Sequence, residues 1–274
     1  MFDVLGYYRH PTIAGDTIVF ASEDDLWAVE AGGGDARRLT ANPGTQSHPR
    51  LSPDGQMVAF TSRDEGPGEV FVMSATGGVS RRLSHFGANT IVVGWTPDGE
   101  EVVAATDHRQ PFGGWHHLWT VPVSGGPARP LPLGPAVALD HAPNGKGRVI
   151  ARHGLDPVRW KRYRGGRAGT LWVDREGDGD FVPLLEVAGN LASPMWIGRR
   201  IYFVSDHEGV GNLYSVTPTG RSLTRHTDHG DFYVRFPHSD GKRVVYHAGA
   251  DLWLFDVARG TTERLEVRLP SSRP

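Results

Sequence analysis

A unit that recurs six times along this sequence of 274 residues is the feature that most limits its fold. Each unit contains a Leu or Val followed by an aromatic residue, at steps of 39 to 53 residues: Leu26-Trp27, Val70-Phe71, Leu118-Trp119, Leu171-Trp172, Leu213-Tyr214 and Leu252-Trp253. This spacing is typical of a four-stranded propeller blade. Aromatic rings suit the wedge between two blades because each buries ~150–250 Å². We therefore assign a structural role to Trp27, Phe71, Trp119, Trp172, Tyr214 and Trp253.

Turn signals and alternating strands keep step with the aromatic pairs. Leu51-Ser52-Pro53-Asp54-Gly55 and Trp95-Thr96-Pro97-Asp98-Gly99 combine the turn-forming residues Pro, Asp and Gly between two apolar runs. Downstream, a Gly-rich hairpin leads to a short strand such as Arg37-Arg38 or Arg81-Arg82, which we place at the blade edge. The sequence thus predicts an all-β, six-bladed β-propeller with four antiparallel strands per blade. The blades span about 9–40, 48–84, 94–131, 139–184, 193–224 and 235–265.

All six units are complete in chain order, which bears on how the ring closes. The last blade needs no strand from the N-terminus, so we predict closure without a shared strand, by packing alone. An alternative is that Phe2 to Tyr8 adds a fifth, outer strand. We take residues 1–268 as a single propeller and 269–274 as the start of a linker to further domains.

Composition and charge exclude several classes of function. The formal net charge of −2 argues against a nucleic-acid-binding surface. The absence of cysteine excludes disulfides and thiolate catalysis. The first residues lack the basic and apolar regions of a signal peptide, and no apolar run approaches the length of a membrane span. A cytoplasmic location is expected.

Motifs that would indicate chemistry are missing. The chain has no G-x-S-x-G elbow, H-E-x-x-H helix or phosphate-binding glycine loop, so we predict no catalytic residue and no cofactor. Asp174, Glu176, Asp178 and Asp180 alternate as in a calcium loop, but Leu185 occupies the position of the bidentate Glu. A solvated hairpin is the preferred interpretation and a weak Ca²⁺ site the alternative.

The histidines of the chain could serve structural roles or bind a metal ion. His10, His48, His141 and His238 recur near the same place in the repeat, which favours structural hydrogen bonds. The pair His116-His117, together with His226 and His229, falls outside the repeat, and we expect surface roles there. We therefore predict no metal site.

The two longest insertions are the best candidates for a binding site. Blades 3 and 4 each carry an insertion before their third strand, at residues 107–115 and 156–167, in which arginine and aromatic residues are interleaved. Enlarged loops on one face of a scaffold commonly carry recognition, and guanidinium groups bind carboxylates through forked hydrogen bonds. Arg109, Arg162 and Arg164 are the candidate substrate-binding residues. Contact with another domain is the alternative role for these loops.

Several segments resemble a known family. The S-P-D-G turn, the L-W pair and the R-R-L-T strand are similar to those of TolB-like six-bladed propellers. A closer resemblance, to the N-terminal propeller of tricorn protease, is carried by His10 to Ile13, Ser22 to Trp27, Trp160 to Gly166, Pro194 to Gly209 and Arg225 to His229.

The resemblance implies a domain of a large cytosolic serine peptidase. Such proteins carry a second propeller, a PDZ domain and a catalytic region, and they form hexamers. This propeller would guide peptides to or from the proteolytic chamber, and the catalytic residues would lie beyond residue 274. Two alternatives remain: a stand-alone TolB-like propeller that binds proteins, and a Ca²⁺-dependent propeller hydrolase with inward-facing acidic or histidine ligands.

Overall fold

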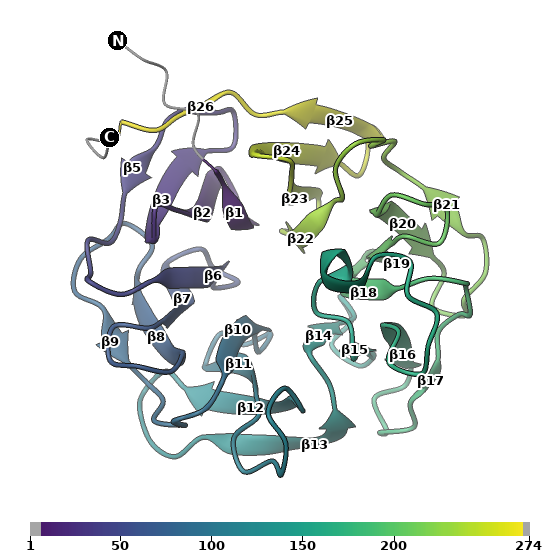
Figure 1. The fold of residues 1–274 in the computed structure, drawn as a ribbon, viewed down its shortest axis with the longest axis horizontal. Helices are drawn as coiled ribbons and strands as arrows, with labels where there is room; N and C mark the ends of the chain where they lie inside the picture. Colours follow the sequence, from purple (N-terminus) through teal and green to yellow (C-terminus); the bar gives the residue numbers. More distant parts are fainter. Residues whose placement is uncertain (1–6, 271–274) are drawn as a thin grey trace.

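Six antiparallel sheets of four strands each surround a central axis (Figure 1). The computed structural model describes residues 7–270, and the predicted six-bladed propeller is confirmed. The 3₁₀ turn η1 (Pro157–Trp160) is the only helix among these residues, and it is far too short to cross a membrane. In every blade the first strand lies innermost and the fourth outermost.

The first three blades follow one another along the chain, and their four strands pair in chain order. In blade 1 a short strand outside the blade's own sheet, β4 (Gly34–Asp35), lies in the chain between the third and fourth strands. Their strands are β1 (Arg9–Ala14), β2 (Thr17–Ser22), β3 (Asp25–Glu30) and β5 (Arg37–Arg38); β6 (Gln46–Leu51), β7 (Met57–Ser62), β8 (Glu69–Ser74) and β9 (Arg81–Arg82); β10 (Thr90–Trp95), β11 (Glu101–Thr106), β12 (His117–Pro122) and β13 (Arg129–Pro135).

The last three blades repeat this order and are followed by one more short strand, β26 (Val267–Arg268). The predicted edge strands at Arg37-Arg38 and Arg81-Arg82 are the outermost strands β5 and β9. The blade strands are β14 (Ala138–His141), β15 (Arg148–Arg152), β16 (Thr170–Asp174) and β17 (Val182–Pro183); β18 (Leu191–Ile197), β19 (Arg200–Ser205), β20 (Asn212–Val216) and β21 (Thr224–Arg225); β22 (Arg235–Ser239), β23 (Arg243–Ala248), β24 (Asp251–Asp256) and β25 (Thr261–Arg264).

Apolar side chains fill the spaces between neighbouring blades. The described residues form six buried clusters, one at each blade-to-blade interface. Each cluster receives one of the six repeated aromatic residues, always from the blade that comes next around the ring; at the closure this is Trp27 of blade 1. Trp27, Phe71, Trp119 and Tyr214 are buried, whereas Trp172 and Trp253 remain partly exposed. Because both faces of a middle strand are covered in this way, its sequence is nearly continuous in apolar residues.

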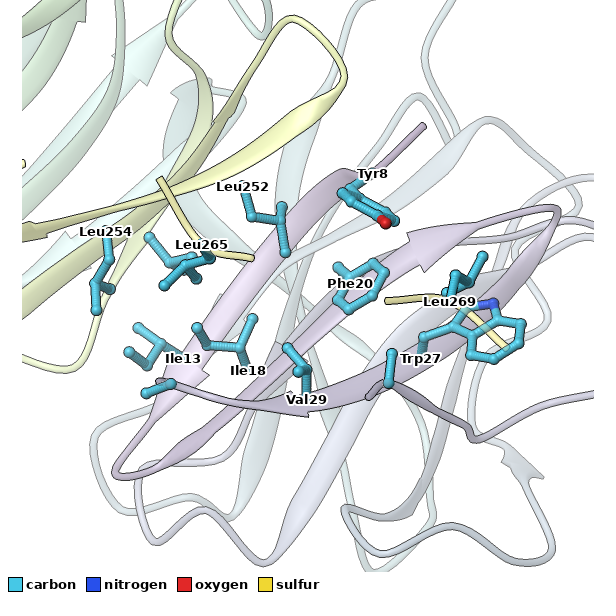
Figure 2. Packing of buried hydrophobic residues seen from close by; sticks show 13 residues of the cluster. Tyr8, Ile13, Ile18, Phe20, Trp27, Val29, Leu252, Leu254, Leu265 and Leu269 are labelled. Atoms are coloured by element: carbon cyan, nitrogen blue, oxygen red, sulfur yellow. The ribbon is translucent and has the colours of Figure 1, made fainter. Parts of the chain in front are cut away.

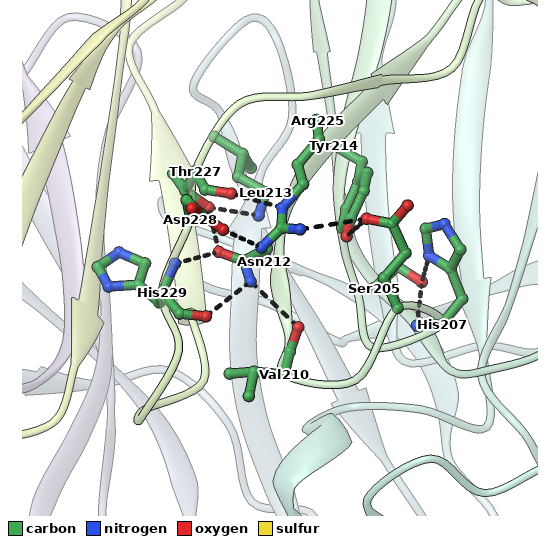
Figure 3. Close-up of polar contacts among 11 residues, drawn as sticks. Ser205, His207, Val210, Asn212, Leu213, Tyr214, Arg225, Thr227, Asp228 and His229 are labelled. Carbon is green, nitrogen blue, oxygen red and sulfur yellow. Dashed lines mark hydrogen bonds and ion pairs between the residues drawn. The ribbon is translucent and has the colours of Figure 1, made fainter.

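A repeated set of side-chain hydrogen bonds holds the outer strand in three of the blades. In blade 5 the buried amide of Asn212 accepts hydrogen bonds from Thr227 Oγ1 and His229 N, both at 2.8 Å, and donates to two backbone carbonyls (Figure 3). Thr227 Oγ1 in turn accepts from Leu213 N. Asp25 with Thr40 repeats the arrangement in blade 1, and Glu69 with Ser84 in blade 2. Every polar atom of these buried groups therefore gains a partner.

The ring closes where blade 6 meets blade 1, and here the structure corrects one prediction. Each blade does have its own four strands, so no blade strand is shared. Closure by packing alone is wrong, however, because β26 continues past blade 6 and pairs in parallel with β4 of blade 1. Gly34 N donates to Glu266 O, and Ala36 N donates to Arg268 O, both at 2.8 Å. A two-residue ladder without an apolar pattern leaves no periodic signal in a sequence.

An apolar cluster lies beneath this ladder and joins the same two blades (Figure 2). Trp27 and Phe20 come from blade 1, Leu252 and Leu254 from blade 6, and Leu269 from the chain that follows β26. Tyr8 is buried in this cluster, and its hydroxyl donates to Val267 O at 3.1 Å. The proposed outer strand from Phe2 to Tyr8 lies mostly outside the described residues, as does most of the proposed linker at 269–274.

The innermost strands are also joined across the closure. Nδ1 of His238 in β22 accepts a hydrogen bond from Ile13 N of β1 at 3.3 Å and lies 3.1 Å from Thr12 Oγ1. Thr12 Oγ1 accepts from Leu51 N of blade 2. The acceptor role of Nδ1 requires a neutral ring with its proton on Nε2.

We expect Leu269→Ala to weaken the closure. Leu269 is 7% exposed, and removing a buried leucine side chain costs about 2–5 kcal/mol of unfolding free energy. Leu223→Ala is the matched control because Leu223 is 44% exposed at an outer edge. Urea denaturation of both variants measures the difference, and equal midpoints would show that the segment after β26 does not stabilise the ring.

A second expectation concerns acid stability. Burial, assisted by the nearby Arg50 guanidinium, lowers the pKa of His238 to about 3. Between about pH 6.5 and pH 3, this histidine is protonated in the unfolded chain but not in the folded chain. The folded state therefore has its full stability above about pH 6.5 and loses stability as the pH falls through this range. In His238→Gln the dependence should become shallower by about 1.4 kcal/mol per pH unit. Urea midpoints measured across this range test it, and parallel pH profiles for both proteins would contradict it.

Candidate binding site in the axial channel

Most of the innermost strands, which surround the axis of the ring, contain a break in their regular pairing. Five of them contain a register shift near their middle, and in four of these a non-glycine residue with positive φ precedes proline. These residues are His10, His48, Ser193 and Phe236, with φ between 47° and 53°. Such backbone is strained for an L-residue and for a residue before proline, and strain of this kind concentrates at functional sites.

A cavity of about 630 Å³ occupies the axis of the ring. All six innermost strands contribute to its wall, and the turns after them, such as Ser52-Pro53 and Thr96-Pro97, line one end. His48, Phe236 and Leu155 line the other end. The volume is that of a pocket for a small organic ligand.

Four aromatic rings from blades 1, 2 and 6 pack together beside the second end of this cavity. His10 stacks on His48 with ring centroids 3.9 Å apart, and Phe236 packs edge-on against His10 at 4.4 Å. His247 lies behind Phe236, at 5.8 Å. Burial lowers the pKa of His48 and of His247 to about 3, and that of His10 well below its usual value, with nearby guanidinium groups acting in the same direction. At neutral pH these rings are therefore uncharged.

The histidines of the repeat only partly behave as predicted. His238 makes the expected structural hydrogen bond, whereas Nδ1 of His10 is buried and has no hydrogen-bond partner within residues 7–270. His226 and His229, for which we expected surface roles, are half-buried and bond to Ser215 and Tyr246. Within residues 7–270 no three His, Asp or Glu side chains are grouped so as to hold a metal ion.

The acidic hairpin considered for calcium has an internal partner. The Asp174 carboxylate is fully buried, forms an ion pair with Arg148 at 2.6 Å and accepts from Gly177 N and Gly179 N. These contacts favour the hairpin interpretation, because the Asp174 carboxylate already binds an arginine and two backbone amides.

Two charged groups on the cavity wall lack a counter-charge. Arg50, in β6, is 8% exposed; its Nε donates to Val93 O and its Nη1 to Pro49 O, with no carboxylate in ion-pair distance among the described residues. Asp140, in β14, accepts from Trp196 N at 2.6 Å and likewise has no cationic partner in that part of the chain. Burial lowers the pKa of Arg50 to about 10 and raises that of Asp140 to about 6.

The three arginines predicted from the sequence lie outside this cavity. Arg109 is exposed in the loop between β11 and β12, where its guanidinium lies 5.9 Å from the ring centroid of Trp119. Arg162 and Arg164 are exposed in the loop between β15 and β16. No hydrogen bond or ion pair among the described residues brings Arg109 together with the other two. Sequence reasoning missed Arg50 and Asp140 because both occupy ordinary positions of repeated strands.

The inserted loop of blade 4 extends from its own blade to blade 6. Asp156 forms a two-point ion pair with Arg235 of β22, with Nη2 to Oδ2 at 2.5 Å. The backbone nitrogen of Arg162 donates to Asp206 of blade 5. In Figure 1 the turn η1 lies near β18 and β22, towards the axis. The loop thus borders the end of the channel that also contains the aromatic rings.

One serine lies beside a histidine, but its hydrogen bonds stabilise a turn. Ser205 Oγ lies 2.9 Å from His207 Nδ1, as Figure 3 shows. Ser205 is fully buried, and its Oγ also accepts from His207 N. Ser62 and Thr106 make the same contact with the amide two residues on, at the corresponding strand ends of blades 2 and 3. A nucleophile needs access to substrate, which burial denies to Ser205.

We expect Asp156→Asn to release the blade-4 loop. Arg235 is 26% exposed and would lose its charged partner, which costs about 1–3 kcal/mol in a half-buried site. Trypsin should then cleave faster after Arg159, Lys161 and Arg162, as followed by mass spectrometry. Asp228→Asn is the control, since that carboxylate is 94% exposed in its pair with Arg225. Equal cleavage rates in the two variants would show that the ion pair does not hold the loop.

Comparison with known proteins agrees with this architecture. Residues 5–261 match the family model of the tricorn protease N-terminal beta propeller domain. Tricorn protease homolog 1 of Streptomyces coelicolor is 43% identical over 272 residues, 97% of this chain and 25% of that protein. Tricorn protease of Thermoplasma acidophilum is 31% identical over 268 residues, 94% and 25% of the two chains. The crystal structure of the tricorn protease superposes with a TM-score of 0.89 at 30% identity, covering 98% of this chain and 27% of that chain.

This chain therefore spans about a quarter of the length of these curated relatives. The likeness extends over nearly all of its residues and is much closer than a shared propeller fold, which separates it from the TolB-like alternative. The chain belongs to the family of tricorn protease N-terminal β-propeller domains.

Proposed function

We propose that this chain is the non-catalytic propeller domain of a tricorn-type serine peptidase, and that it guides peptides to or from the catalytic region through its axial cavity. The observation that carries the proposal is the cavity itself, because inner strands of all six blades line about 630 Å³ on the axis of the ring. Relatives named tricorn protease support a parent peptidase.

The partners follow from this role. Peptides are the ligands; the second propeller, PDZ domain and catalytic region of the same polypeptide are its intramolecular partners, and the parent forms a homo-oligomer in the cytoplasm. The length of the relatives, about four times that of this chain, supports the presence of such additional domains.

The exposed arginines retain a proposed role in substrate contact. Arg109, Arg162 and Arg164 have no carboxylate partner among the described residues, so their guanidinium groups are free to bind the carboxylates of a peptide. Exposed aromatic residues, including Trp115 and Trp160, accompany them on the same two loops. Stacking and forked hydrogen bonds together suit an extended peptide.

The test narrows the cavity without disturbing the backbone. Gly94 lines the cavity, has no positive φ, and a Cβ built on it meets no atom within 4 Å. A side chain can therefore begin at this position without a clash, and we expect Gly94→Trp to place an indole in the cavity. We expect it to weaken binding of a fluorescein-labelled decapeptide by tenfold or more, about 1.4 kcal/mol, in a fluorescence anisotropy titration.

Gly32→Trp is the matched control, because Gly32 is exposed on an outer hairpin with equal space around it. It should bind the peptide like the unmodified chain. Unchanged affinity in Gly94→Trp, or hydrolysis of the peptide by the 274-residue chain itself, would overturn the proposed function.

A further inference from the structure

The charges inside the cavity follow an unusual arrangement. Proteins seldom bury a charged side chain unless an opposite charge or a full set of hydrogen bonds accompanies it. Arg50 and Asp140 are of opposite sign and line the same cavity, yet no ion pair joins them. They lie on the inner strands of blades 2 and 4, which the inner strand of blade 3 separates.

Both groups are held in place by the backbone of the next blade. Arg50 donates to Val93 O of β10 at 3.2 Å, and Arg50 O accepts from Trp95 Nε1 of the same strand at 2.8 Å. Asp140 is fixed by Trp196 N of β18. Nη2 of Arg50 has no hydrogen-bond partner among residues 7–270, and it is not one of the fully buried polar atoms. This nitrogen remains available to a ligand in the cavity.

The other charges of the wall are already neutralised or exposed. Arg243 is paired with Asp240 at 2.8 Å and donates to Gly15 O, and Lys242 is exposed. His48 and His238 are uncharged at neutral pH because burial keeps their pKa low. Apart from the exposed ammonium of Lys242, the cavity presents one guanidinium, that of Arg50, and one carboxylate, that of Asp140, without an opposite charge among the described residues.

We propose that the axial cavity is a binding site for short peptides with two free ends, in which Arg50 binds the terminal carboxylate and Asp140 binds the terminal ammonium group. A zwitterionic ligand supplies the counter-charge that each side chain lacks, and charge-assisted hydrogen bonds of this type are the strong ones. Trp95, Leu139 and Trp196 also line the cavity and offer apolar surface to the ligand. The inference rests on the proposed function in one respect, namely that peptides enter the cavity.

Calorimetric titration of the 274-residue chain with four forms of trialanine tests this assignment. The probes are the free peptide, its N-acetyl form, its C-terminal amide, and the form blocked at both ends. We expect blocking either end to weaken binding by at least tenfold, and blocking both to weaken it further. This comparison uses the unmodified protein, so it stands even if a variant fails to fold.

Variants then assign each end to its residue. In Arg50→Gln the free peptide and the amide should bind equally, whereas the N-acetyl form should still bind more weakly than the free peptide. In Asp140→Asn the free peptide and the N-acetyl form should bind equally, whereas the C-terminal amide should still bind more weakly than the free peptide. Arg129→Gln, an exposed arginine outside the cavity, is the control and should leave all four affinities unchanged.

The outcomes separate this inference from the function on which it rests. If all four peptides bind with the same affinity, peptides enter the cavity but their ends are not recognised, and the inference fails alone. If none of the four peptides binds at millimolar concentration and the decapeptide also fails to bind, both proposals fail. Discrimination that persists unchanged in Arg50→Gln and Asp140→Asn would overturn the assignment of these two residues.

Discussion

The constraint on which this structure depends is that blade 6 must meet blade 1. A single blade exposes two apolar faces, so its middle strands are covered only when both neighbours are present. At the closure, burial of Leu252, Leu254 and Leu265 contributes about 1.5–3 kcal/mol for each side chain, against about 0.5–1.5 kcal/mol for each of the two β26–β4 backbone bonds. Packing therefore supplies most of the stability, and the short ladder fixes β26 beside β4.

Closure also determines the chemistry of the axis. Six inner strands meet there side by side, and the positive-φ residues before proline in four of them bring His10, His48 and Phe236 against one another. The histidines in this contact are neutral because the ring buries them. Consequently one end of the channel is bordered by uncharged rings, although three of its four aromatic residues are titratable side chains. The charge of the channel is left to Arg50, Asp140 and the residues near the turns.

The sequence predicts those features that repeat and misses those that do not. The aromatic pairs and S-P-D-G turns were enough for the six blades and for the outer strands at Arg37-Arg38 and Arg81-Arg82, because these depend on local periodicity. The β26–β4 pairing was missed because it joins two-residue segments from opposite ends of the chain. Arg109, Arg162 and Arg164 stand out as insertions, whereas Arg50 occupies a repeated strand. Whether Arg50 has a counter-charge depends on the neighbouring blades, which no local pattern specifies.

Rigidity explains how two opposite charges can share a cavity without neutralising each other. The wall strands are hydrogen-bonded within their blades and wedged between neighbours, so Arg50 and Asp140 can approach only as far as their side chains reach. Both side chains are further restrained by backbone groups of the next blade. In a flexible pocket the pair would collapse into an ion pair, whereas in a closed ring the separation of the charges is preserved. Such preorganisation lowers the cost of binding a ligand whose own charges are held apart.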